Sequence, residues 1–532
     1  MRKILFCLIA FLLVMQLATI NAYSNTEQAE NITIPKEAVF EKKLTIDIGD
    51  GIQQVGYSPR IEGIANQGPQ SFAVDNDNLY ILDTLNKKIL VYNDLKWIKN
   101  ISISMCSYPR DIIAQDNRIF ILDDSGYIFE IDANGDIQEF QKLPDKLQAY
   151  QVNKLSFDSN DNLILDLGDS AYINQNKDWK SIETDSVEVT GKTATINKIK
   201  NGNIIDISFM EKSGGVNIIG SDKYDNTYVE IIDDVPDSSL VLIESALRKY
   251  DKSGKLISMA RIPLEDYYNY PLRFFNVTDD GEVYIMALKD SSVEINKIIL
   301  GETYNSKMYE LKKKANAFSN NIAKEQSISE PLSDPGVPTR TEVQNRANAM
   351  INLVWTYNES NRVNPNPSTV EMPWYLQDII NFPSSQVGIP YCWGGFDGID
   401  RSSSPSVWSN FKDAMSKSKF AGNVDVYSSL YYTSGTAGID CSGFVSAALG
   451  FTTKYNTTML YNTGNFVSTP LRMDYYVDPG IHVLFFYSWA DSGMTKLNSK
   501  ESTIDGTPQA TKNYTRTKNW LSTNGYSLKS PW

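Results

Sequence analysis

The chain contains Phe72-Ala-Val-Asp-Asn-Asp-Asn-Leu-Tyr-Ile-Leu-Asp83, an apolar strand, a tight polar turn and a second apolar strand. The same pattern returns in Ile112–Asp123, Leu155–Asp166 and Phe274–Ala287. The ends of the four units are 40, 43 and 121 residues apart, and the last interval is close to three steps of the first. Periods of roughly 40–45 residues that each carry several short strands are typical of a β-propeller, whose blades stack around a centre.

We therefore predict an all-β propeller over residues 40–302, with about six blades and with five or seven as alternatives. Between 186 and 262 the register is ambiguous, because both Asn203–Asp206 and Tyr228–Ile232 fit the inner hairpin. Lys43–Ile48 has the alternation of an outer strand that closes the last blade. The region resembles propellers of the NHL type. A pair of β-sandwiches is the alternative, because turn spacing alone fits both architectures.

The N-terminus has the pattern of an export signal. Arg2 and Lys3 are basic, Ile4–Ile20 is largely apolar, and Ala22 ends a small-residue cleavage site. We expect residues 1–22 to be a signal peptide, with an uncleaved anchor as the alternative. No other segment approaches the ~18 consecutive apolar residues of a membrane helix. The mature protein is then expected to be secreted or associated with the cell wall, without a membrane span.

Charge and rare residues exclude several kinds of function. The net charge of −14 gives no electrostatic basis for binding nucleic acid. The chain has one histidine, His482, which excludes metal sites built from several histidines. Three cysteines remain after export: Cys106, Cys392 and Cys441. Because the cysteines are few and odd in number, they suggest one reactive thiol and two buried residues rather than a disulfide framework.

Residues 303–340 separate two regions of different composition. Ser306–Lys324 is polar and lysine-rich and is a candidate helix, and 326–339 carries three prolines. Proline at this density gives an extended spacer. We therefore expect few contacts between the propeller and a second domain at 341–532, and we expect that domain to fold alone.

The second domain contains a cysteine with the features of a nucleophile. In Gly438-Ile-Asp-Cys-Ser-Gly-Phe-Val-Ser-Ala-Ala-Leu-Gly450, Asp440 is a good N-cap and apolar residues follow at helical spacing. Cys441 then lies in the first helical turn, where free backbone N–H groups and the helix dipole favour a thiolate. Ser442 and Gly443 leave the approach to the sulfur open. A buried cysteine in an ordinary amphipathic helix is the alternative.

A cysteine nucleophile needs a base and an orienting group. Ile481-His-Val-Leu-Phe-Phe-Tyr487 has the composition of a buried strand with His482 near its start. On the next predicted strand, Thr495, Leu497, Ser499 and Glu501 share a face by alternation. Glu501 or Ser499 can reach the imidazole, and we favour Glu501 because a carboxylate also stabilises the imidazolium.

The combination of Gly388-Ile-Pro-Tyr-Cys-Trp-Gly-Gly395, the Asp-Cys-Ser-Gly segment and a Gly-Ile-His-Val strand resembles the NlpC-type cell-wall cysteine peptidases. The resemblance covers roughly residues 385–505 and implies a papain-like α+β domain. It implies that Cys441 is the nucleophile, His482 the base and a polar residue such as Glu501 the third member. It also places Tyr391 beside the nucleophile. The predicted substrate-binding residues are Tyr391, Trp393, Asp440 and Ser442.

The resemblance implies an exported bacterial hydrolase that cleaves amide bonds in peptidoglycan stem peptides, commonly next to D-glutamyl residues. No metal or organic cofactor is expected. A wall polymer or a protein is a further candidate partner, bound by the propeller. About 44 residues separate Gly395 from Asp440, which is more than the family usually has, and Leu484, Phe485 and Phe486 make the strand after His482 bulkier than usual.

Two alternatives to this function remain open. In one, the protein is a propeller-based binding or adhesion protein whose hydrolase-like domain has no relevant turnover. In the other, it is a cysteine amidase or acyltransferase that acts on another exported substrate. The presence of both Cys441 and His482 argues against the first alternative.

Overall fold

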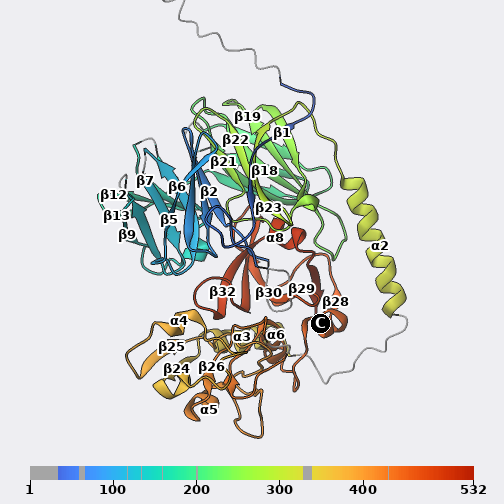
Figure 1. The fold of residues 1–532 in the computed structure, drawn as a ribbon. Coiled ribbons are helices and arrows are strands. Elements are labelled where there is room, and N and C mark those ends of the chain that lie inside the picture. The colour runs from blue at the N-terminus through green and yellow to red at the C-terminus, as the bar shows by residue number, and fades with distance from the viewer. Residues whose placement is uncertain are drawn as a thin grey trace, which may run out of the picture.

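A computed structural model gives the fold of the chain (Figure 1). It describes residues 34–58, 66–116, 118–132, 135–158, 160–198, 202–326, 338–428 and 431–532. The predicted signal peptide at 1–22 and most of the proline-rich segment lie outside these ranges. Within them, no helix is long and apolar enough to cross a membrane.

The N-terminal part is a β-propeller, as predicted. Three consecutive four-stranded antiparallel sheets come first. Their strands are β2 (Ser71–Asp75), β3 (Asn78–Asp83), β4 (Lys88–Asn93) and β5 (Lys96–Ser102); β6 (Pro109–Gln115), β7 (Arg118–Asp123), β8 (Tyr127–Ile131) and β9 (Ile137–Lys142); and β10 (Lys154–Phe157), β11 (Leu163–Asp166), β12 (Ala171–Gln175) and β13 (Asp178–Ile182). The predicted repeats fall on the first two strands of each sheet.

The second half of the propeller contains one smaller sheet and two further sheets of four strands. The strands are β14 (Ser186–Thr190), β15 (Thr193–Asn197) and β16 (Ile204–Ser208); β17 (Lys212–Ser221), β18 (Thr227–Asp234), β19 (Ile243–Tyr250) and β20 (Leu256–Ile262); and β21 (Phe275–Val277), β22 (Val283–Leu288), β23 (Ser292–Ile299) and β1 (Val39–Asp47). Short 3₁₀ turns are η1 (Ala149–Gln151) and η2 (Leu264–Asp266).

These sheets settle the register between 186 and 262, the strand that closes the propeller and the number of sheets. Tyr228–Ile232 lies in β18, the second strand of a four-stranded sheet, whereas Asn203–Asp206 contributes to β16, the third strand of the smaller sheet. The N-terminal strand β1 pairs antiparallel with β23, from Val39 opposite Ile299 to Asp47 opposite Ser292, and closes the last sheet as expected. The described residues thus form six propeller sheets, five with four strands and one with three.

The C-terminal part is built on a six-stranded sheet with the order β28-β33-β29-β30-β31-β32. Its strands are β28 (Asn465–Phe466), β29 (Tyr475–Asp478), β30 (His482–Trp489), β31 (Lys496–Thr503), β32 (Ala510–Thr517) and β33 (Ser527–Ser530). The remaining elements are α3 (Arg340–Ile351), β24 (Val354–Tyr357), η3 (Glu359–Arg362), α4 (Trp374–Gln377), β25 (Ser384–Val387), α5 (Phe411–Ser416), β26 (Phe420–Ala421), β27 (Thr436–Ala437), α6 (Cys441–Ala448), α7 (Thr457–Thr463) and α8 (Lys518–Thr523).

The six-stranded sheet lies between the propeller and the helices α3 and α6 (Figure 1). On β30, Val483 and Phe485 pack into the helix-side core, while Leu484 and Phe486 pack into a second core shared with the propeller. This division follows from the period of two along a strand. Both faces of the sheet are therefore buried, which explains the bulky run after His482.

The expectation of few contacts between the two parts is wrong. The shared core joins the side chains of Tyr228, Leu247, Phe486, Trp520 and Leu528, among others. Backbone hydrogen bonds also cross the boundary, from Val241 N–H to the Tyr526 carbonyl (2.9 Å) and from Leu528 N–H to the Ser239 carbonyl (2.7 Å). Prolines restrict the backbone of the spacer itself. They do not determine whether the two parts that the spacer connects pack against each other.

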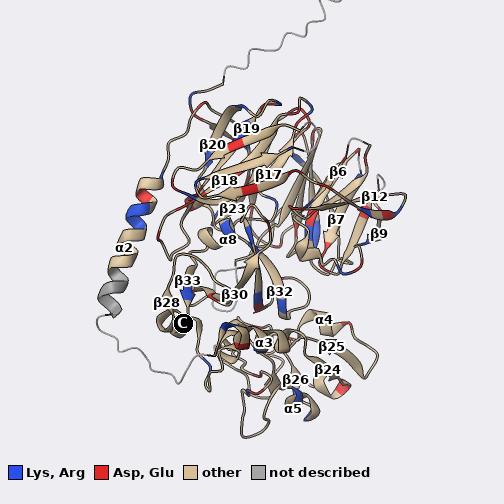
Figure 2. Cartoon of the chain, turned by 180° about the vertical axis from the view of Figure 1, so that it is seen from behind, with Lys and Arg blue, Asp and Glu red and all other residues tan. Residues whose placement is uncertain are grey.

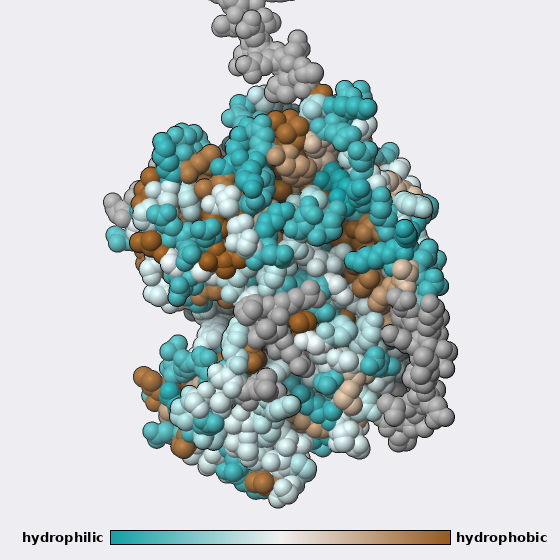
Figure 3. Space-filling model, turned by 45° about the vertical axis from the view of Figure 1, so that its right-hand side comes forward, coloured by the Kyte–Doolittle hydropathy of each residue, from teal (hydrophilic) through white to brown (hydrophobic). Residues whose placement is uncertain are grey.

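The predicted lysine-rich helix forms as α2 (Met308–Gln326) and bridges the two parts (Figure 1). Met308 and Ala315 pack against Val235 and Leu242 of the propeller. Further along the helix, the Phe318 ring meets the Phe466 ring of β28 edge to face, with centroids 5.5 Å apart. On the face that Figure 3 shows, hydrophobic residues form several separate patches.

Candidate active site

Asp440 begins the helix that carries the cysteine, as predicted. Its Oδ1 accepts hydrogen bonds from the Gly443 N–H (2.7 Å) and the Ser442 hydroxyl (3.0 Å). Its Oδ2 accepts from the Gly394 N–H (3.0 Å) and pairs with the Lys454 ammonium at 2.6 Å. The Asp440 carboxylate thus fixes the start of α6 through contacts with protein groups, and its role in substrate binding stays a prediction.

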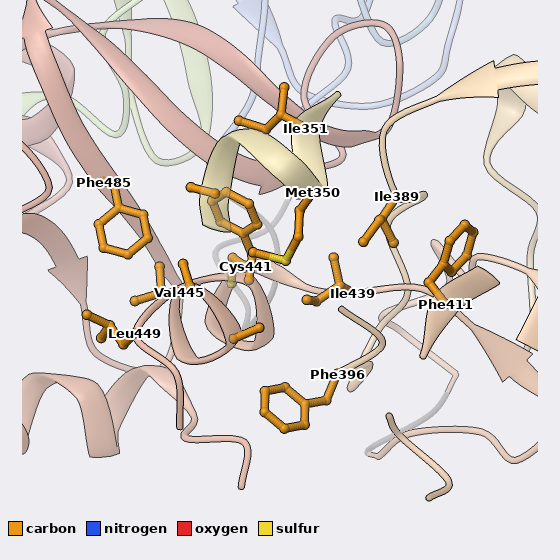
Figure 4. Close-up of a cluster of buried hydrophobic side chains, with 14 of the residues drawn as sticks. Met350, Ile351, Ile389, Phe396, Phe411, Ile439, Cys441, Val445, Leu449 and Phe485 are labelled. Atoms are coloured by element: carbon orange, nitrogen blue, oxygen red, sulfur yellow. The ribbon is translucent and has the colours of Figure 1, made fainter. Parts of the chain in front are cut away.

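Cys441 is the first residue of α6, so its backbone N–H has no acceptor within the helix. Cys441 is only 2% exposed and lies among Met350, Ile439 and Val445 (Figure 4). Gly443 also permits a close contact behind the helix start. A Cβ at this position would come within 2.2 Å of the Gly395 carbonyl oxygen, so glycine allows the Trp-Gly-Gly segment to pack against the helix.

His482 is the first residue of β30, and its buried imidazole lies between two candidate partners. Nε2 is 2.9 Å from Glu501 Oε2. Nδ1 is buried and forms no hydrogen bond with the described residues, which leaves this nitrogen for the Cys441 thiol. Burial alone would lower the pKa of His482, but its interactions with Cys441 and Glu501 raise the pKa to about 10. The imidazole is therefore held as an imidazolium at neutral pH.

Glu501 occupies the place predicted for the third group. Besides the imidazole, it accepts hydrogen bonds from the Ser499 hydroxyl (2.6 Å) and from Arg516 Nη2 (2.7 Å). Burial raises the pKa of Glu501, but the charges of Arg516 and His482 outweigh burial and hold this pKa well below its usual range. The sequence left Ser499 and Glu501 as alternatives. In the structure, both belong to one chain of hydrogen bonds, with Glu501 next to the imidazole.

Sequence reasoning missed the residues behind Glu501. Arg516, on β32, pairs with Glu501 and also with Asp505 (2.7 Å between Nη1 and Oδ2). Asp505 in turn accepts a hydrogen bond from Gln67 of the propeller. In Figure 2, the basic residues of β32 lie between the propeller and the helices of the C-terminal part. The alternation along β32 is a local signal that could place Arg516 on one face of the sheet, but no local pattern predicts a partner more than 400 residues away in the chain.

Tyr391 and Trp393 lie close to the start of α6. Tyr391 forms a parallel bridge with Ile439, two residues before the cysteine, and is fully buried. Trp393 is 8% exposed and packs with Tyr391 and Val426. The structure thus brings together Cys441, His482 and Glu501, with Tyr391 and Trp393 beside them, and Ser442 is 4% exposed within α6.

The other two cysteines have different surroundings. Cys392 is fully buried, and its sulfur is 3.2 Å from the Thr436 hydroxyl. Cys106 lies in a core of the propeller. Burial raises the pKa of both thiols, in the case of Cys106 to about 12. All three described cysteines are free. The one histidine of the chain interacts with Cys441, and the charges that act on Cys392 and Cys106 come from other residues.

No family model and no curated protein matches the chain. Among solved structures, hydrazine synthase from Kuenenia stuttgartiensis is 12% identical, with 44% of this chain and 77% of that chain covered and a TM-score of 0.29. A streptogramin B lyase is 12% identical over 50% of this chain and 98% of its own, with a TM-score of 0.28. BamB from Moraxella catarrhalis is 10% identical over 49% and 98%, with a TM-score of 0.25. Similarity of this extent identifies no activity and no ligand.

Proposed function

We propose that the protein is an exported bacterial cysteine hydrolase that cleaves amide bonds in peptidoglycan stem peptides. The observation that carries this proposal is the chain of side chains from Cys441 through His482 to Glu501, with the cysteine at a helix start and a 2.9 Å contact between imidazole and carboxylate. These are the nucleophile, base and orienting group that a cysteine peptidase requires. The substrate class comes from the resemblance to NlpC-type peptidases.

The chemistry follows the positions of these groups. The proton of Cys441 resides on His482, which is an imidazolium at neutral pH, and the resulting thiolate attacks the peptide carbonyl carbon. The free N–H groups at the start of α6 stabilise the oxyanion that forms. The imidazolium then gives its proton to the leaving amine, and water releases the acyl group from the thioester. Glu501 stabilises the imidazolium throughout, and Arg516 keeps Glu501 ionised.

Turnover also requires local opening, because Cys441 is 2% exposed and His482 is 1% exposed. Residues packed around the thiol must move before a peptide carbonyl reaches it. The propeller then serves as a binding or targeting module for the wall. A cysteine amidase or acyltransferase for another exported substrate uses the same three residues, and a pure adhesion protein uses none of them.

The experiment that tests the function is digestion of purified peptidoglycan by the full-length mature protein, followed by mass spectrometry of the soluble fragments. We expect fragments whose masses correspond to hydrolysed amide bonds within the stem peptides. The Cys441→Ala protein, which keeps the propeller intact, should bind the wall to the same extent and release nothing above background. Binding without release by both proteins would favour the adhesion alternative.

The raised pKa of His482 predicts an unusual pH dependence. The imidazolium is the acid for the leaving amine, and its pKa of about 10 keeps it protonated through neutral pH. We therefore expect kcat/KM to fall only as the pH rises through about 10, and not near 6.5. Glu501→Gln removes a charge that raises this pKa, so the alkaline limb should move to lower pH by about one unit or more.

The measurement is a pH profile from about pH 6 to pH 11 on a short stem peptide, with the limb read as the apparent pKa of the free enzyme. Glu130→Gln, which removes a propeller carboxylate paired with Arg118, is the matched control and should leave the limb in place. A wild-type limb near pH 6.5, or an unchanged limb in Glu501→Gln, would contradict the assignment.

A further inference from the structure

The propeller encloses a central channel of about 1240 Å³. Its wall is formed by the inner strands of the five four-stranded sheets, β2, β6, β10, β17 and β21. Its floor comes from the C-terminal part, which contributes Thr495, Lys496, Thr517 and Asn519. This volume exceeds the ~300–1,000 Å³ of ordinary ligand pockets. The channel is thus large enough for a short peptide and is closed at one end by the candidate hydrolase domain.

Lys496 brings an ammonium group without a direct partner to this floor. The residue is 7% exposed, and its ammonium forms no hydrogen bond or ion pair with any described residue. Burial lowers the pKa of Lys496 to about 8, although Asp491 and Asp166 oppose this effect from beyond ion-pairing distance. The group is therefore still largely protonated at pH 7. A buried unpaired cation is costly, and an anion in the channel would remove that cost.

The neighbouring cations of the channel are paired. Lys154 Nζ donates to the carbonyls of Ile218 (3.0 Å) and Ile219 (2.6 Å). Arg273 makes a bidentate ion pair with Asp111, with Nε 2.7 Å and Nη2 2.5 Å from the two carboxylate oxygens. These two side chains hold the wall together, whereas Lys496 remains available to a ligand.

Asn519 adds an unused acceptor beside Lys496. Lys496 is the register partner of Thr517, and Asn519 follows two residues later. The Asn519 side chain is 2% exposed; its Nδ2 donates to Glu230 (2.6 Å), while its Oδ1 is buried without a partner in the described residues. The floor thus offers a cation for a carboxylate and an acceptor for an N–H group. The last residue of a peptide carries both groups next to each other.

The opposite end of the channel is strongly acidic. The inner strands end in hairpin turns that line this mouth with carboxylates, and these are Asp75, Asp77, Asp116, Asp158, Asp161, Asp222, Asp225, Asp279, Asp280 and Glu282. Three of these carboxylates, Asp280, Asp222 and Glu282, pair with Lys223, Lys249 and Lys297, and Lys198 pairs with Asp185. The mouth therefore repels polyanions and attracts an ammonium group.

We propose that the channel binds the C-terminal end of a short peptide with a basic group, with its carboxylate on Lys496, its last amide N–H on Asn519 Oδ1 and its basic end at the acidic mouth. The lengths agree, because an extended tetrapeptide spans roughly 13 Å and the five residues of β2 span roughly 17 Å. This is a binding site for the propeller, separate from Cys441, and it does not depend on turnover.

The test is calorimetric titration of full-length Cys441→Ala protein, which cannot hydrolyse its ligand, with the tetrapeptide Lys-Ala-Ala-Ala. We expect binding of the free carboxylate form and about tenfold or more weaker binding of the C-terminal amide, because a charge-assisted hydrogen bond is lost. Adding Lys496→Met should remove this preference. Lys500→Met is the matched control, because Lys500 is a buried lysine of the same strand whose Nζ bonds Asn513 outside the channel; it should keep the preference.

A second measurement needs no channel variant. Glu-Ala-Ala-Ala should bind the same protein more weakly than Lys-Ala-Ala-Ala, because its first side chain meets the acidic mouth. Equal affinity for the carboxylate and the amide would overturn the proposal. So would a preference that survives Lys496→Met, or no binding of any peptide at millimolar concentration. None of these results bears on hydrolysis at Cys441, which the digestion experiment tests separately.

Discussion

Replacing Cys441 by alanine is expected to abolish hydrolysis, with a loss of roughly 10⁴-fold or more, because no other group can form the acyl intermediate. The fold should persist, because alanine suits the first turn of α6 and the site is lined by apolar residues. His482→Ala should lower turnover by about 10²-fold or more, the scale for loss of a general base. The measurement is the release of amine from a short stem peptide, with thermal unfolding recorded for each variant.

Cys106→Ala and Cys392→Ala are the controls for this experiment, because each also removes one buried thiol. Both should retain turnover close to wild type. Comparable activity in Cys441→Ala and wild type would remove the nucleophile assignment, and loss of activity only in Cys392→Ala would move the assignment to that thiol.

A fragment of residues 338–532 is expected not to fold on its own. Separation from the propeller exposes large apolar side chains of the sheet and of α8, among them Leu484, Phe486, Trp520 and Leu528. Exposing each such side chain costs about 1.5–3 kcal/mol, so four of them alone cost on the order of 10 kcal/mol, which is comparable to the whole stability of a domain. We expect an aggregated or loosely folded fragment without a cooperative thermal transition.

The matched control is the full-length protein, cut between its two parts only after it has folded. A protease site placed within 327–337 allows the chain to be cut after folding, and the two pieces should then co-elute in gel filtration and unfold near the temperature of the uncut protein. A soluble 338–532 fragment with a cooperative transition, or pieces that separate after cleavage, would show that the interface contributes little.

The parts of the fold that were predicted correctly are those encoded over short distances. Each propeller hairpin, such as Phe72–Asp83, contains its two strands and their turn within twelve residues, so its alternation is visible in the sequence. The three-stranded sheet at 186–208 was not resolved, because its short strands fit either register. The face of the six-stranded sheet that packs against the propeller was also missed. Buried apolar residues such as Leu484 and Phe486 give the same sequence pattern in the core of a domain and in an interface between domains.

In the candidate site, too, the residues that were predicted correctly are those that a local sequence pattern places. Asp440 and Cys441 are placed by a local helix start, and His482 stood out as the one histidine. Glu501 was inferred from alternation on the neighbouring strand. Arg516 and its link through Asp505 to the propeller depend on strand pairing and on docking between the two parts, which one sequence does not specify.

Competitive alkylation tests most directly whether His482 and Glu501 activate Cys441. Native protein is treated with limiting iodoacetamide at pH 7, and the label on each cysteine is measured by peptide mapping. We predict that Cys441 reacts about tenfold or more faster than Cys106 and Cys392, whose pKa values are raised by burial, and that His482→Ala removes this advantage. Labelling of Cys441 no faster than the other two, or undiminished labelling in His482→Ala, would contradict the account.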